Sequence, residues 1–108
     1  MMVILRLVLL GILLSGLATQ AGAEWNRKQR GDFTADCLES CRANPNVHPS
    51  RRAECGAYCG CVLGEAEKFI TSADYEVQNK LVEEGKSSPT IERFRKIFPM
   101  CGTRVFGN

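Results

Sequence analysis

The chain has 108 residues, of which 44% are hydrophobic and 24% charged, and its formal net charge at pH 7 is +2. This length is enough for one domain and too short for two. The small net charge indicates no strongly electrostatic partner, so we expect no binding to nucleic acid.

Residues 1–23 have the pattern of a secretory signal peptide. Arg6 is followed by an apolar run over residues 7–17 and by the small residues Ala21-Gly22-Ala23. The apolar run is shorter than the ~20 residues that a membrane-spanning helix needs. We expect cleavage after Ala23 and a periplasmic or secreted protein. The alternative is an uncleaved signal that anchors the domain to the membrane.

Residues 24–31 are polar and basic and show no apolar periodicity, which predicts a flexible arm. Weak contact with a membrane surface is expected through Trp25, Arg27, Lys28 and Arg30, because an aromatic ring and basic side chains bind acidic headgroups. The alternative is that Trp25 docks on the domain.

A disulfide-stapled helical domain is predicted over residues 32–108. Its first helix is expected to begin at Asp32 or Thr34, which are good N-cap residues, and to end at Asn44-Pro45. A loop then leads to Pro49, a favourable first residue for a second helix that runs to near Ile70. The apolar stripe of the second helix consists of Cys55, Cys59, Val62, Ala66, Phe69 and Ile70.

Two further helices are predicted after Ile70. The first follows the capping signal at residues 71–74 and ends near Gly85. The second opens with Ser88-Pro89 and ends at Pro99. The first of these helices carries Tyr75, Gln78, Leu81 and Val82 on related faces. The buried stripe of the second consists of Ile91, Phe94, and Ile97 or Phe98. Four helical segments without an alternating strand pattern predict an all-α fold.

The six cysteines all follow residue 23, and an even number in a short exported chain predicts three disulfides. Six cysteines allow 15 connectivities. The first two cysteine pairs have a four-residue spacing, so each pair lies on one face of its helix, and antiparallel helices would join outer to outer and inner to inner. Cys61 is rotated by about 200° from Cys59 and points elsewhere. The predicted bonds are Cys37–Cys59, Cys41–Cys55 and Cys61–Cys101.

The cysteines allow two other interpretations. A zinc site is disfavoured because His48 is the only nitrogen ligand available. The sequence Cys59-Gly60-Cys61 would serve thiol–disulfide exchange if the two cysteines formed a strained bond, but a bridge of that spacing fits a helix poorly. We expect no catalytic residue, cofactor site or metal site.

The twin Cys-x-x-x-Cys spacing resembles the disulfide-linked helical hairpin of the α-hairpinins, small secreted plant peptides of which some are antimicrobial or inhibit proteases. The resemblance covers about residues 33–62 and consists of spacing alone. Cys61, Cys101 and the longer C-terminal half depart from that family, so its activities are not carried over. The segment Tyr58-Cys59-Gly60-Cys61 before a capped helix is also similar to small exported bacterial helical proteins.

The leading functional hypothesis is a non-enzymatic exported protein that binds another protein or acts as an accessory subunit. A secreted antimicrobial or enzyme-inhibitory effector is the first alternative, with residues 44–52 as its reactive loop. A periplasmic thiol–disulfide protein is the second alternative, centred on Cys59 and Cys61.

Overall fold

The computed structural model describes residues 24–107, so the expected signal peptide over residues 1–23 lies outside the described part of the chain. The described residues are all-α and contain no strand. None of their helices has the length and apolar character needed to cross a membrane. The elements are α2 (Arg27–Ala43), the 3-10 helix η1 (Pro49–Glu54), α3 (Cys55–Glu67), α4 (Ser72–Glu83), α5 (Pro89–Arg95) and α6 (Ile97–Phe106).

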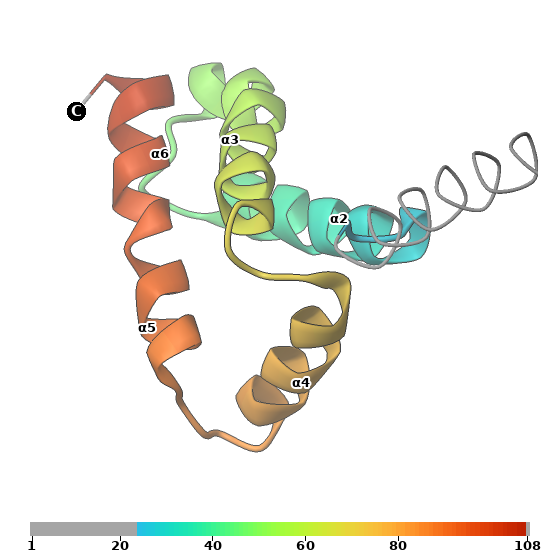
Figure 1. The fold of residues 1–108 in the computed structure, drawn as a ribbon. Coiled ribbons are helices and arrows are strands. Elements are labelled where there is room, and N and C mark those ends of the chain that lie inside the picture. The colour runs from blue at the N-terminus through green and yellow to red at the C-terminus, as the bar shows by residue number, and fades with distance from the viewer. Residues whose placement is uncertain (1–23, 108) are drawn as a thin grey trace, which may run out of the picture.

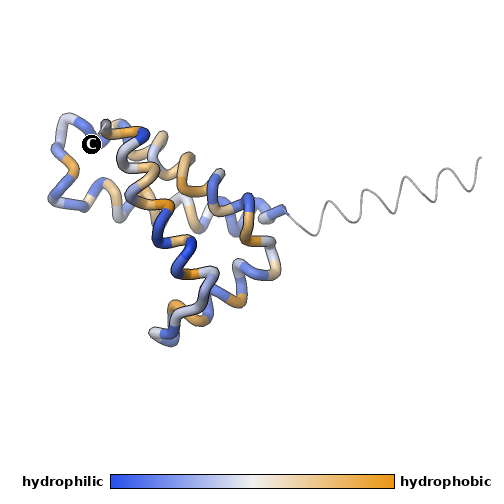
Figure 2. The backbone as a smooth tube through the Cα atoms, turned by 60° about the vertical axis from the view of Figure 1, so that its left-hand side comes forward, coloured by the Kyte–Doolittle hydropathy of each residue, from blue (hydrophilic) through white to orange (hydrophobic). Residues whose placement is uncertain are grey.

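Helix α3 is the centre of the arrangement. It packs against α2 on one side and against α6 on the other, and α5 continues into α6. Helix α4 stands apart from α3 and joins α5 through a loop at the bottom of the view (Figure 1). Hydrophobic and hydrophilic residues are interspersed along the helices (Figure 2), which is the pattern of helices with one apolar face.

The N-terminal segment differs from the prediction of a flexible arm over residues 24–31. Helix α2 already begins at Arg27, because Asn26 and not Asp32 or Thr34 is its N-cap. The Asn26 side chain accepts a hydrogen bond from the Gln29 backbone N–H at 2.8 Å, and the Gln29 side chain accepts one from the Asn26 N–H at 3.0 Å. This capping box satisfies two backbone donors that a helix start leaves without partners.

The second predicted helix is divided between η1 and α3. It starts at Pro49 as expected, but its first six residues form a 3-10 helix and the α-helix ends at Glu67. Short 3-10 segments are common at the ends of α-helices.

Helix α4 has the ends that the sequence predicts. Thr71 and Asp74 form a capping box at its start. At its end Gly85 has φ of +71°, and the N–H groups of Lys86 and Gly85 donate to the carbonyls of Leu81 and Val82. This is the Schellman arrangement, which favours glycine because it needs a left-handed backbone.

The last predicted helix does not end at Pro99. Helix α5 stops at Arg95, and α6 begins at Ile97 and continues past Pro99 to Phe106. Pro99 is the third residue of α6, within the first turn, where backbone N–H groups have no partner inside their own helix. Proline therefore interrupts the helix before it and is tolerated in the helix that contains it.

Three disulfides join the helices, and they are the pairs expected from the cysteine spacing. Two join α2 to the η1–α3 segment and one joins α3 to α6. The bonds are Cys37–Cys59, Cys41–Cys55 and Cys61–Cys101, each with 5.8 Å between its Cα atoms. The main apolar core lies beside them and consists of Trp25, Val62, Ala66, Ile70, Ile97 and Cys101.

Candidate functional site

An open cleft of about 400 Å³ lies between α2, α4 and α5. Volumes of roughly 300–1,000 Å³ are typical of ligand sites. Its apolar lining comes from every part of the domain and comprises Trp25, Phe33, Tyr58, Ile70, Tyr75, Val82, Ile91, Phe94 and Phe98, beside the disulfide-bonded Cys37 and Cys41.

A continuous series of ring contacts crosses the cleft. Tyr75 of α4 lies 4.6 Å from Trp25, measured between ring centroids, and Trp25 lies 5.6 Å from Phe33 of α2. Phe33 contacts Phe94 at 6.0 Å, and Phe94 contacts Phe98 at 4.9 Å. Edge-to-face contacts of this kind hold rings in defined positions, so the cleft has an ordered aromatic wall.

Trp25 fixes the base of this wall. Its side chain is only 4% exposed, and its Nε1 donates a hydrogen bond of 2.8 Å to the carbonyl of Ile70. The bond satisfies the polar end of a buried indole and joins the start of α2 to the α3–α4 connection.

Polar side chains line the rim of the cleft. Asp36 and Ser40 of α2 and its C-cap Asn44 line it at a spacing of four residues. Gln78 and Asn79 line it from α4, and Thr90 lines it from α5. Among these described lining residues Asp36 is the only charged one, and it is exposed.

The negative potential at this rim is felt by Tyr75. Burial raises the pKa of Tyr75, and the carboxylates of Asp32, Glu76 and Asp36 raise this pKa further. The Lys28 ammonium lowers this pKa, but it is the smallest of these effects, so the balance of charge near the Tyr75 ring favours a cation over an anion.

Helix α4 forms a loosely held wall of the cleft, because none of its residues is buried. Val77 and Val82 are 57% and 56% exposed, although both are apolar. Only Val82 of this pair lines the cleft. Polar bonds hold its first residue and its middle: Gln29 donates to the Ser72 carbonyl at 3.0 Å, and Ser88 donates to the Gln78 side chain at 2.5 Å.

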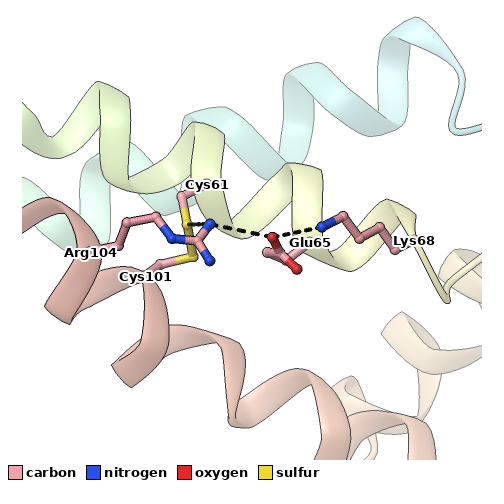
Figure 3. The surroundings of a disulfide bond; sticks show 5 residues. All are labelled: Cys61, Glu65, Lys68, Cys101 and Arg104. Atoms are coloured by element: carbon pink, nitrogen blue, oxygen red, sulfur yellow. Dashed lines mark hydrogen bonds and ion pairs between the residues drawn. A yellow bond between two sulfur atoms is a disulfide. The ribbon is translucent and has the colours of Figure 1, made fainter.

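The Cys61–Cys101 disulfide has a charged environment on the far side of α3 (Figure 3). Arg104 donates to the Cys61 sulfur at 3.5 Å and to the Glu65 carboxylate at 3.3 Å. Lys68 donates to the same carboxylate at 2.9 Å. The hydrogen bond from Lys68 is the main cause that lowers the pKa of Glu65, and Arg104 adds to it.

The geometry of this bond does not favour thiol exchange. Cys61 is half-buried, whereas Cys101 is fully buried. A thiolate that attacked the accessible Cys61 sulfur would expel the Cys101 sulfur as a thiolate in an apolar core, where burial raises the pKa of a thiol. Cys59 and Cys61 are bonded to different partners and not to each other.

All six cysteines are used in disulfides, so no thiolate remains for a metal. In residues 24–107 no group of three or more His, Cys, Asp or Glu side chains is placed to hold a metal ion. His48 has a local role instead: its Nδ1 accepts from the Ser50 N–H at 3.1 Å and lies 2.7 Å from the Ser50 hydroxyl. It therefore caps η1.

The four residues expected to contact a membrane surface have other surroundings. Trp25 is in the core. Lys28 pairs with Asp32 at 2.7 Å. Arg30 makes a two-pronged bond to Glu67 at 2.8 and 3.0 Å, which links α2 to α3. Of the four, Arg27 alone is exposed without a charged partner within the described part of the chain.

The sequence predicted amphipathic helices but not this cleft. The faces that carry Tyr75 and Val82, and Ile91 and Phe94, were visible as periodic apolar stripes. Periodicity alone does not show whether such stripes pack against one another or leave a gap between them. Comparisons with protein-family models, curated proteins and solved structures found no match to this chain.

Proposed function

We propose that this protein is an exported, non-enzymatic binding protein of an oxidising compartment. It takes an apolar segment of a partner protein into the cleft between α2, α4 and α5. The observation that carries the proposal is the aromatic wall, which is ordered and yet lines an open cleft. A concave apolar surface with a few polar groups at its rim is the usual form of a recognition site.

The cleft offers binding and little catalytic chemistry. Its described lining contains one carboxylate, Asp36, and no histidine, lysine or arginine. General acid–base or nucleophilic catalysis needs a positioned base beside a second functional group. An aromatic surface with one charge is better suited to recognition.

Compartment and scaffold support the same proposal. Three disulfides in a small helical domain are consistent with an oxidising extracytoplasmic compartment, and a periplasmic or secreted location follows if residues 1–23 act as a signal. The two bonds between α2 and the η1–α3 segment extend the resemblance to the α-hairpinins, which we propose for the scaffold alone.

The inhibitory alternative has less support. A protease-inhibitor loop must present an extended backbone, whereas Pro49–Glu54 forms a 3-10 helix. Arg51 is also held there by Glu54 at 2.5 Å and by the Phe106 carbonyl at 3.3 Å.

Val82 and Val77 provide a matched test of the cleft. Both are valines of α4 with nearly equal exposure, and only Val82 lines the cleft. The probe is a capped amphipathic helical peptide with a leucine stripe and a neutral glutamine face. We expect Val82→Ser to weaken its binding about fivefold, because apolar contact is lost, and Val77→Ser to leave the affinity unchanged.

Binding is followed by calorimetry and by the emission of Trp25, which is the only tryptophan in the chain and lies at the base of the cleft. An equal effect of the two serine variants, or no binding of the peptide at millimolar concentration, would contradict the proposal.

A further inference from the structure

We infer that the occupant of the cleft is an amphipathic helix of a partner protein that presents a lysine or arginine to Asp36. This inference rests on the proposed function and adds the secondary structure and the charge of the bound segment. It follows from three properties of the cleft: the elements that form its walls, the charge on its rim and the rings beside that charge.

The walls favour a helical occupant. They are formed by helices, and the described residues contain no strand and hence no sheet edge. An extended peptide in such a cleft would leave its backbone N–H and C=O groups without partners, at a cost for each buried group. A helix satisfies its own backbone and offers an apolar stripe, which is the helix-in-groove mode of recognition.

The charge on the rim favours a basic side chain. Asp36 is exposed, lines the cleft, and forms no ion pair within residues 24–107. Its neighbours Asp32 and Glu76 raise the pKa of Tyr75 together with it, so the negative potential extends over this end of the cleft. Asp32 is already paired with Lys28 at 2.7 Å, which leaves Asp36 as the carboxylate available to a ligand.

The rings beside Asp36 strengthen the preference for a cation. Phe33 precedes Asp36 by three residues on the same face of α2, and Tyr75 faces them from α4. A lysine or arginine that reaches Asp36 would have its alkyl stem on these aromatic faces, and cation–π attraction would add to the ion pair. The same potential would repel the carboxylate of a fatty acid.

The test uses three capped helical peptides with the same leucine stripe, which differ at one polar position that holds Lys, Gln or Glu. Each is titrated into the full disulfide-bonded chain and followed by calorimetry and Trp25 emission. We expect the Lys peptide to bind about fivefold more tightly than the Gln peptide and the Glu peptide to bind more weakly than both.

Two variants assign this preference to Asp36. Asp36→Asn should remove most of the preference for Lys over Gln, while the affinity for the Gln peptide stays the same. Glu39→Gln is the matched control, because Glu39 is also an exposed acid of α2 but does not line the cleft. It should keep the full preference for Lys. Both side chains are exposed, so neither change is expected to impair folding.

The outcomes separate this inference from the proposed function. Equal binding of the three peptides to the unchanged chain would overturn the inference and leave the apolar cleft as a binding site. Binding of none would overturn both. Binding of dodecylammonium but not of the peptides would assign the cleft to a lipid-like amine. A reversible dimer that closes the cleft, detected by sedimentation, would assign the cleft to a second copy of the chain. Either result would overturn the inference.

Discussion

Gln29 is the one polar side chain among the described buried residues, at 4% exposure. Its amide nitrogen donates to the Ser72 carbonyl at 3.0 Å and to the Glu76 carboxylate at 2.9 Å. Its oxygen accepts from the Asn26 N–H at 3.0 Å and from the Ser72 hydroxyl at 2.8 Å. One side chain therefore completes the cap of α2 and also holds the first turn of α4.

Replacement of Gln29 should destabilise the domain and loosen α4. We expect Gln29→Ala to lower the free energy of unfolding by about 2 kcal/mol, because several buried partners lose their hydrogen bonds together. Arg27→Ala is the control in the same turn, since Arg27 is exposed, and it should change the free energy by less than about 0.5 kcal/mol. Urea unfolding followed by circular dichroism measures both. Equal stability of the two variants would show that water replaces the Gln29 contacts.

At the scale of residues, the sequence predicted what depends on local spacing. The cysteine pairs follow from the rotation of about 100° per residue in a helix, which separates Cys61 from Cys59. The burial of Trp25 and Gln29 does not follow from spacing, because their partners Ile70 and Ser72 are more than forty residues away in the chain. Without these partners, a polar segment before a helix is typical of a flexible arm.

The elements show the same division between local and distant causes. The ends of α4 were predictable because Thr71, Asp74 and Gly85 act through neighbouring backbone groups. The division of the last helix was not predicted, since Pro99 can either end a helix or lie in the first turn of another. The disulfide from Cys101 to α3 holds α6 in place beyond the proline.

Helix α4 should be the most dynamic helix of the described domain. It has no buried residue, and polar side-chain bonds join it to the rest of the protein at Ser72, Glu76 and Gln78. We expect its amides to exchange with deuterium earlier than those of α3, which carries four buried residues. The leucine-stripe peptide should slow exchange in α4 when it fills the cleft. Protection of α4 equal to that of α3 in the free protein would contradict this expectation.

At the scale of the molecule, the cleft exists because the disulfides determine which helices meet. Two bonds hold α2 to the η1–α3 segment and the third holds α6 to α3, whereas α4 has no covalent link to any of them. The space between α2 and α5 is thus an open cleft that α4 lines without a covalent link. The sequence predicted the bonds and the all-α class, but the gap depends on how apolar stripes from separate segments fit, and no single stripe contains that information.

The Cys61–Cys101 bond should therefore control the C-terminal half of the cleft. It spans 40 residues, against 14 for Cys41–Cys55, so in the chain-entropy model its removal costs about 4 kcal/mol and removal of the shorter bond about 3 kcal/mol. The two disulfides differ more in which helices they hold than in how much their removal costs. Without its disulfide to α3, α6 is held only by non-covalent contacts, among them those of Ile97, the bond from Arg104 to Glu65 and the bond from Arg51 to the Phe106 carbonyl. Helix α5 is attached to α6.

We compare Cys61→Ala/Cys101→Ala with Cys41→Ala/Cys55→Ala, two double variants that each remove one disulfide including a fully buried cysteine. The first should lose hydrogen-exchange protection in α5 and α6 and bind the leucine-stripe peptide at least tenfold more weakly, because Phe94 and Phe98 of the cleft wall move with these helices. The second, which also changes the cleft-lining Cys41, should lose protection around the junction of η1 and α3 and lose less affinity than the first, because α5 and α6 remain bonded to α3. Equal loss of affinity in the two variants would mean that the cleft depends on the stability of the whole domain and not on the position of its C-terminal helices.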